Sequence, residues 1–165
     1  MLHKVSIAGL TIDPTSNTPI IILQSEDGEQ VVPIWIGLLE ATSIAAVLQN
    51  IHFDRPMTHD LLKSFLDLLE IKVVKIEVND LRDNTYFAKI YCSSEEKTFS
   101  MDARPSDAIA IALRFEAPVY VDDKVIEKSQ ATDGKSVMLD KSSEGEKWAE
   151  YLEKLSPEDF GKYKV

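Results

Sequence analysis

Two segments of the chain place an arginine, a hydroxyl residue and an aspartate at the start of a predicted helix. They are Arg55-Pro56-Met57-Thr58-His59-Asp60 and Arg104-Pro105-Ser106-Asp107. Proline keeps the residue before it out of the helical region, and a following Thr or Ser can cap the first turn. Helix N-termini and arginines both attract phosphate. The two segments therefore predict a phosphate-binding set of Arg55, Arg104, Thr58 and Ser106.

Carboxylates accompany both segments, and carboxylate oxygens are the ligands that Mg²⁺ and Mn²⁺ prefer. If the two helix starts converge, these groups could hold a divalent cation whose bound water attacks a phosphodiester. His59 is suited to act as a general acid or base near neutral pH. The predicted catalytic residues are His59, Asp60, Asp102, Asp107 and Glu40, with Asp102 and Asp107 as the metal ligands.

A purely structural interpretation accounts for the same residues one at a time. Thr58 and Ser106 would cap helices, and the aspartates of the two first turns would complement the helix dipoles. Asp102 and Arg104, two apart on an extended stretch, would form an ion pair, while His59 would be a hydrogen-bonded residue at the border of an apolar face. The common phosphate-binding loops and catalytic signatures are absent from the sequence. Spacing alone does not choose between the two interpretations.

The acidic composition limits how this chain can bind nucleic acid. Its 165 residues include 18 Lys and Arg against 28 Asp and Glu, a formal net charge of −10. Phosphate contact normally needs a basic footprint, so any nucleic-acid contact must depend on a local site or on a metal that offsets the carboxylates. The single Cys92 excludes an intramolecular disulfide and a cysteine-based zinc site, and its apolar strand favours a buried structural thiol.

Apolar patterning predicts a mixture of strands and helices. Strands are expected over 5–12, 20–23, 31–36, 73–78, 85–92, 97–103 and 117–121, with a polar loop over 79–84. Helices are expected over 38–51, 58–70 and 107–115, and the last is apolar nearly all round, as a buried helix is. Pro33 places its strand at an edge or a bulge. This order indicates an α+β fold, with helices packed on a mostly antiparallel, curved sheet in a single compact domain.

The composition changes after residue 126, where the predicted domain (1–126) ends. Val125 and Ile126 would extend or re-enter the sheet, and 127–146 has the Ser, Asp, Gly and Lys content of a solvated loop. Within 127–165 an amphipathic C-terminal helix is expected, whose apolar stripe is Trp148, Tyr151, Leu152 and Leu155. No segment reaches the length of a membrane span and the N-terminus has no long apolar run, so we expect a cytoplasmic protein without membrane contact.

Several stretches together carry a resemblance to a known family. They are Val32-Pro33-Ile34-Trp35-Ile36-Gly37 with Glu40-Ala41, then residues 55–61, 102–110 and 117–121. In this combination, over about residues 1–125, the chain resembles the bifunctional nuclease (BFN) domain family, and its end resembles that of the short bacterial members. The resemblance implies an α+β fold, a homodimer, and nuclease activity on DNA and RNA.

Two hypotheses of different classes follow. The first is a nuclease, assisted by a divalent cation, that hydrolyses phosphodiester bonds in DNA and RNA. The second is a non-catalytic dimeric binding or regulatory module, favoured by the net charge of −10 and by the missing catalytic signatures. The relative position of the two Arg-Pro segments separates them, because Asp60 and Asp107 on different sides of the molecule could not share a metal, whereas Asp102, Arg104 and His59 converging in an open cleft would favour catalysis.

Overall fold

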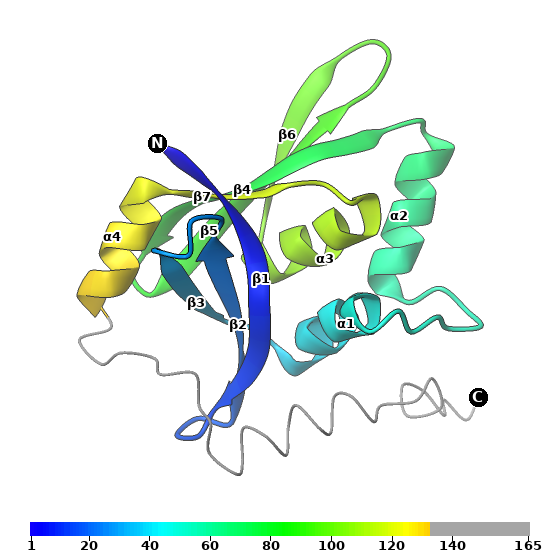
Figure 1. Ribbon diagram of the computed structural model, residues 1–165. Helices are drawn as coiled ribbons and strands as arrows, with labels where there is room; N and C mark the ends of the chain where they lie inside the picture. The colour runs from blue at the N-terminus through cyan, green and yellow to red at the C-terminus, as the bar shows by residue number, and fades with distance from the viewer. Residues whose placement is uncertain (133–165) are drawn as a thin grey trace.

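A single curved sheet of seven strands organises the molecule. The computed structural model describes residues 1–132. Its strands are β1 (Leu2–Asp13), β2 (Thr18–Ser25), β3 (Val31–Trp35), β4 (Lys72–Arg82), β5 (Thr85–Ser93), β6 (Thr98–Ala103) and β7 (Val119–Asp122). They lie in the order β3-β2-β1-β7-β4-β5-β6 (Figure 1), and in this sheet the neighbours are antiparallel except for the parallel pair β4 and β7. Register shifts in β1 and β4 bend these strands. The predicted α+β class is confirmed.

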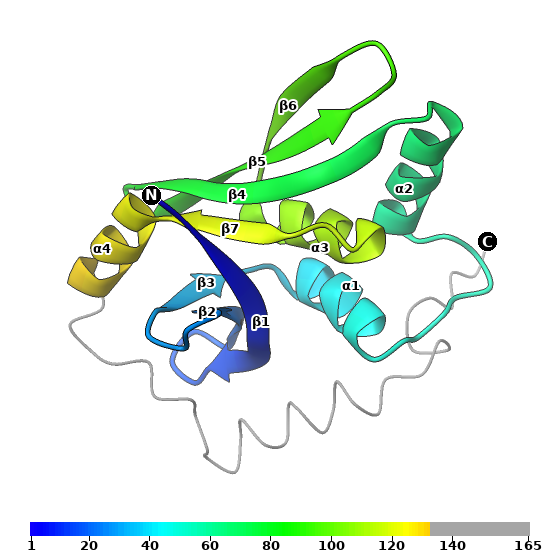
Figure 2. The same cartoon turned by 45° about the horizontal axis from the view of Figure 1, so that its top comes forward.

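Four helices complete the described part of the chain: α1 (Leu38–Leu48), α2 (Thr58–Leu68), α3 (Pro105–Phe115) and α4 (Asp123–Thr132). The central helix is α3, which packs against α1 and α2 and against the strands β4 and β5 (Figure 2). Its residues 108–112, alternating Ala and Ile, are all 0% exposed. Small alanines let a helix approach its neighbours closely, so α3 can be covered by α1, α2 and the sheet at once. The start of α3 is thereby fixed against the starts of α1 and α2.

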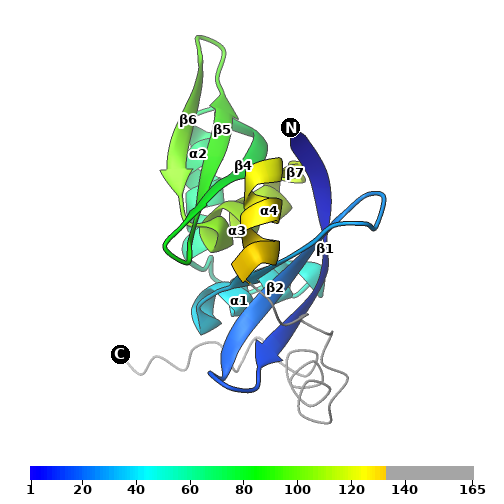
Figure 3. The ribbon, with the colours of Figure 1, turned by 90° about the vertical axis from the view of Figure 1, so that its left-hand side faces the viewer.

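Two stretches differ from the sequence expectation. The predicted loop over 79–84 is strand as far as Arg82, and the turn is the pair Asp83-Asn84, both with positive φ. Such a two-residue turn suits a hairpin, and Asn and Asp tolerate this conformation well. Residues 123–132 form α4 instead of a strand at Val125 and Ile126 followed by a loop from 127. Those two apolar side chains are buried because α4 packs against β3, β4 and β7 (Figure 3).

Other expectations concern single residues and segments. Pro33 lies on β3, which is an edge strand, as predicted. The predicted helix around Trp148 lies outside the described residues. Among residues 1–132, no helix is long and apolar enough to cross a membrane.

The buried thiol of Cys92 gives a first prediction. Cys92 lies on β5, is 1% exposed, and burial raises the pKa of its thiol. Because the thiolate is the reactive form, we expect Cys92 to react with a disulfide reagent at pH 8 far more slowly in the native protein than after unfolding in urea. The release of the coloured thiol product measures both rates in the same sample. Equal rates would show that Cys92 is not in the core.

Candidate functional site

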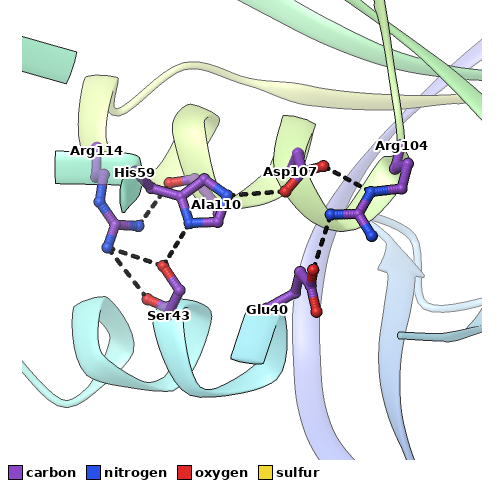
Figure 4. A network of polar contacts seen from close by, with 7 residues as sticks. All are labelled: Glu40, Ser43, His59, Arg104, Asp107, Ala110 and Arg114. Atoms are coloured by element: carbon purple, nitrogen blue, oxygen red, sulfur yellow. Dashed lines mark hydrogen bonds and ion pairs between the residues drawn. The ribbon is translucent and has the colours of Figure 1, made fainter. Parts of the chain in front are cut away.

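The starts of α2 and α3 meet the first two turns of α1 around one polar network. Figure 4 shows His59 reaching from α2 to Asp107 on α3, with Ser43 of α1 below it. His59 Nε2 lies 2.9 Å from Asp107 Oδ1, so the two Arg-Pro segments are in direct contact. The convergence that the sequence left open is therefore present. It depends on α3, the buried helix that both other helices cover.

His59 is held at both ring nitrogens and is 12% exposed. Its Nδ1 lies 2.8 Å from Ser43 Oγ, and Ser43 Oγ also accepts a hydrogen bond from Arg114 Nη2 at 3.0 Å. Arginine only donates, so the Ser43 hydroxyl is free to donate to Nδ1 of a neutral His59. The other nitrogen, Nε2, then carries the proton and donates to Asp107. The network thus selects one tautomer of the neutral imidazole.

Arg104 links the same aspartate to α1. Its Nε donates to Asp107 Oδ2 at 2.8 Å, and its Nη2 donates to Glu40 Oε1 at 2.7 Å. The Arg104 side chain is 66% exposed, and its Nη1 makes no hydrogen bond to any described residue. Burial would raise the pKa of Asp107, but hydrogen bonds from Arg104 and His59 outweigh it and hold that pKa below its usual range. Hydrogen bonds to Asp107 and Glu40 raise the pKa of Arg104, which stays charged.

Glu40 reaches Arg104 across the start of α1, and Gly37 provides the space. Gly37 precedes the helix with an ordinary φ of −71°, so its backbone would suit other residues. A Cβ atom built on Gly37, however, would lie 2.1 Å from Glu40 Oε2. A side chain at this position would push the Glu40 carboxylate away from its present place. Gly37 is therefore required by the folded-back position of Glu40.

Sequence reasoning missed two members of the network, Ser43 and Arg114. Arg114 is 5% exposed, and its Nε donates to Asp60 Oδ1 at 2.6 Å. Its other nitrogens donate to Ala110 O and to Ser43, so every nitrogen of this buried cation makes a hydrogen bond. The signal in the sequence was an arginine at the end of a helix that is otherwise apolar. Such a residue needs a buried anion, and only the tertiary structure identifies it as Asp60.

The two predicted hydroxyl caps are wrong. Met57 and Arg104 precede the helices, while Thr58 is the first residue of α2 and Ser106 the second of α3. Pro105 occupies the first helical position, which suits a residue without an N–H and moves Ser106 into the helix. At α2 the Asp60 carboxylate takes the capping role, since Met57 N donates to its Oδ2 at 3.0 Å.

The remaining predicted residues lie outside the network. Arg55 and Thr58 are exposed and make no side-chain hydrogen bond within residues 1–132. The predicted ion pair between Asp102 and Arg104 is wrong, because the chain turns into α3 at Arg104 and the guanidinium meets Asp107 and Glu40 instead. Asp102 is an exposed residue of the edge strand β6 and forms no ion pair with a described residue.

The carboxylates do not form a preformed metal site. Within residues 1–132, no group of three or more His, Cys, Asp or Glu side chains is placed to hold a metal ion. Glu40, Asp60 and Asp107 each pair with an arginine, which a cation would have to displace. Asp102 and Asp107 as metal ligands therefore stay a prediction.

Two cavities flank the network. One, of about 740 Å³, is lined by the segment after α1 together with Asp60 and Arg114. The other, of about 700 Å³, has Arg104 and Ser106 in its wall. The network is most open to solvent at Arg104, its most exposed member.

Comparisons with known proteins identify the family to which the chain belongs. The model of the bifunctional nuclease domain family matches residues 21–133, and the chain belongs to that family. An uncharacterised protein of Mycobacterium tuberculosis is 32% identical over 164 residues, which cover 96% of this chain and 98% of that protein.

Plant relatives carry the family's name. Bifunctional nuclease 2 of Oryza sativa is 29% identical over 68% of this chain and 36% of its own length. Bifunctional nuclease 1 of Arabidopsis thaliana is 31% identical over 62% of this chain and 33% of its own length. The match thus covers about a third of each plant protein.

Substitution of Gly37 tests the position of Glu40. We expect Gly37→Ala to lower the free energy of unfolding by about 1 kcal/mol or less, because a flexible carboxylate can move but loses its place beside Arg104. The penalty should shrink in a Glu40→Ala background, where nothing is displaced. Urea denaturation of the four proteins measures this. Equal penalties in both backgrounds would contradict the steric role of Glu40.

The lowered pKa of Asp107 predicts a pH-dependent contribution to stability. Its stabilisation is present above the unfolded-state pKa, about 3.9, and is lost as the pH falls through the lower native pKa. The difference in unfolding free energy between wild type and Asp107→Asn should therefore shrink below about pH 4. Urea denaturation at a series of pH values measures it, with the exposed Asp102→Asn as the control. A difference that persists unchanged at pH 3 would rule out this contribution.

Proposed function

We propose that this chain is a nuclease that hydrolyses phosphodiester bonds in DNA and RNA, in the cytoplasm as its sequence suggests. Membership of the bifunctional nuclease domain family supports the reaction class. The observation that carries the proposal is an exposed arginine, Arg104, paired with a carboxylate, Asp107, that can accept a proton and is hydrogen-bonded to a histidine. Arg104 presents an unused Nη1 to solvent, and its partner Asp107 is also bonded to His59.

The proposed reaction needs one water molecule and one proton relay. Water attacks phosphorus, the bond from phosphorus to the leaving oxygen breaks, and Arg104 offsets the negative charge that develops on the phosphoryl oxygens. The Asp107–His59 pair accepts the proton of the attacking water and returns it to the leaving oxygen. Asp107 faces the substrate in this scheme, because it is 33% exposed whereas His59 is 12% exposed and engaged at both nitrogens. Ser43 and Arg114 position the imidazole.

Assistance by Mg²⁺ or Mn²⁺ is a separate part of the proposal. The described carboxylates do not form a preformed donor set for a metal ion, so the proposed hydrolysis is written without one. Magnesium in proteins is often held by one or two carboxylates together with substrate phosphate. Asp102 and Asp107 are the ligands that the sequence predicts for such a cation.

A cleavage assay tests the reaction and the metal together. Pure protein is assayed on single- and double-stranded DNA and RNA with Mg²⁺, Mn²⁺ or a chelator. We expect Asp107→Asn and His59→Gln to lower the cleavage rate by about 10²-fold or more, because each removes a partner of the proton relay. Glu95→Gln, an exposed change in the turn between β5 and β6, should leave the rate unchanged.

The outcomes of this assay separate the parts of the proposal. Cleavage that survives in Asp107→Asn and His59→Gln contradicts the site. Metal-dependent cleavage that is lost in Asp102→Ala supports the predicted cation ligands, and cleavage that resists the chelator and tolerates Asp102→Ala removes the cation from the proposal.

A second candidate function, a non-catalytic dimeric binding module, is favoured by one surface. The apolar face of α2 is exposed: Leu61 60%, Leu62 37%, Phe65 56%, Leu68 82% and Leu69 51%. These positions repeat at helical spacing, so they share one side of α2. Contiguous exposed apolar side chains mark interaction sites. We propose that this face pairs with a second copy of the chain, whichever of the two functions holds.

The dimer is tested through the α2 face. We expect wild type to be a dimer by light scattering and Leu68→Glu to be a monomer, because a buried unpaired carboxylate would face the partner. Val31→Glu places the same charge on the distant edge strand β3 and should stay dimeric. A monomeric wild type, or a dimeric Leu68→Glu, would contradict this interface.

A further inference from the structure

The cavity beside Arg104 has a lining that the proposed reaction does not explain. It measures about 700 Å³, a volume typical of sites that bind small organic molecules. The end of β3, the turn between β4 and β5, helix α4 and the start of α3 all contribute to its wall. Ile34, Ile36, Leu81 and Pro105 make much of this wall apolar. A bare phosphate would leave such a lining unused, so the cavity suits a larger ligand.

Two aromatic side chains in this wall are fixed by hydrogen bonds. Trp35 Nε1 donates to Asp13 Oδ2 at 2.9 Å, and the Tyr86 hydroxyl donates to Pro33 O at 2.9 Å. Each ring is thereby anchored through its polar atom, and both residues line the cavity. Trp35 is 38% exposed on an edge strand, so it is accessible to a ligand. Rings held in this way are suited to stack on a planar ligand without loss of side-chain freedom.

Two polar groups at the start of α3, the Ser106 hydroxyl and Arg104 Nη1, line the same cavity and make no hydrogen bond to residues 1–132. Ser106 is 5% exposed, and its hydroxyl makes no hydrogen bond within the described residues. It nevertheless lines the cavity together with Arg104, whose Nη1 is also unused. The Ser106 hydroxyl is therefore available to donate to, or accept from, a ligand atom that enters the cavity. The α3 N-terminus and Arg104 both favour a negative group at this end.

From these observations we infer that the cavity binds one unpaired nucleotide, with its base against Trp35 and Tyr86 and its phosphate at Arg104. The inference rests on the proposed function and names the form of nucleic acid that the site takes. Glu40 and Asp107 offset the charge of Arg104, and the chain carries −10 overall, so phosphate attraction alone is weak. Stacking of the base therefore supplies most of the affinity. A base inside a duplex is already stacked and paired, which makes single strands and frayed ends the preferred substrates.

A titration without catalysis tests the cavity. The chain has two tryptophans, so a Trp148→Phe background leaves Trp35 as the single tryptophan reporter. Adenosine monophosphate, adenosine and ribose 5-phosphate are titrated against its fluorescence, and calorimetry is used for variants of Trp35. We expect the nucleotide to bind most tightly, the nucleoside about 3- to 10-fold more weakly, and ribose 5-phosphate not to bind at the same concentrations.

Variants then assign the parts of the ligand to residues. Trp35→Leu should weaken nucleotide and nucleoside binding by about 10-fold or more. Ser106→Ala should also weaken nucleotide binding, and this change lies on α3, away from the edge strand β3 that carries Trp35. Arg104→Ala should reduce nucleotide affinity to that of the nucleoside. Lys97→Ala removes an exposed cation at the far end of β6 and should change nothing.

The result that overturns the inference is distinct from the one that overturns the nuclease. Absence of nucleotide binding at millimolar concentration, or unchanged affinity in both Trp35→Leu and Ser106→Ala, overturns the cavity assignment even if the protein cleaves nucleic acid. Nucleotide binding with these mutational effects but without cleavage supports the cavity and contradicts the reaction. Equal or faster cleavage of blunt duplex than of a single strand of the same sequence contradicts the preference for unpaired nucleotides.

Discussion

The carboxylate of Asp107 holds the functional end of this molecule together. One of its oxygens accepts a hydrogen bond from His59 on α2, and the other accepts one from Arg104 at the start of its own helix. Arg104 in turn reaches Glu40 on α1. Three helices that are separate in sequence are thereby joined at their starts, α2 to α3 through Asp107 and α1 to α3 through Arg104. Removal of this anion would take one hydrogen-bond partner each from His59 and Arg104, and would leave them with Ser43 and Glu40 alone.

Burial of the charged groups of this network costs desolvation free energy. This cost suggests that the network serves a purpose beyond joining the helices. Arg114 is 5% exposed, and charged groups are rarely buried so deeply unless they are paired and fully hydrogen-bonded. Asp60, Ser43 and Ala110 together satisfy it. A well-packed apolar cluster could join three helices with less desolvation. The polar network fixes the imidazole of His59 in one tautomer beside an exposed arginine, which an apolar cluster would not do.

Much of the fold could be predicted from the sequence, because apolar patterning reports which faces are buried. The alternation in the strands and the apolar residues of α3 led to the α+β class, and Pro33 indicated an edge strand. Helix α4 was missed because its two buried residues, Val125 and Ile126, are adjacent and are followed by polar residues, a pattern that a strand end would also show. The extent of β4 was missed because its final residues, apart from Leu81, are polar.

The site was predicted in part, and the errors of that prediction have one physical origin. The sequence identified Asp107, His59, Arg104 and Glu40, since each lies at or near a helix start. It could not pair them, because ion-pair partners depend on how α1, α2 and α3 pack. Arg104 therefore received the neighbouring Asp102 as its expected partner, and Ser43, an ordinary helix residue in the sequence, was not identified at all.

Asp107 joins Arg104 and His59 into one working unit, and a double-mutant cycle on cleavage of single-stranded DNA tests this most directly. Rates are compared for wild type, Arg104→Ala, His59→Gln and the double variant. We expect strong non-additivity, with the double variant cleaving about as fast as the slower single variant. Two losses that simply multiply would contradict the claim, as would wild-type cleavage that neither substitution affects.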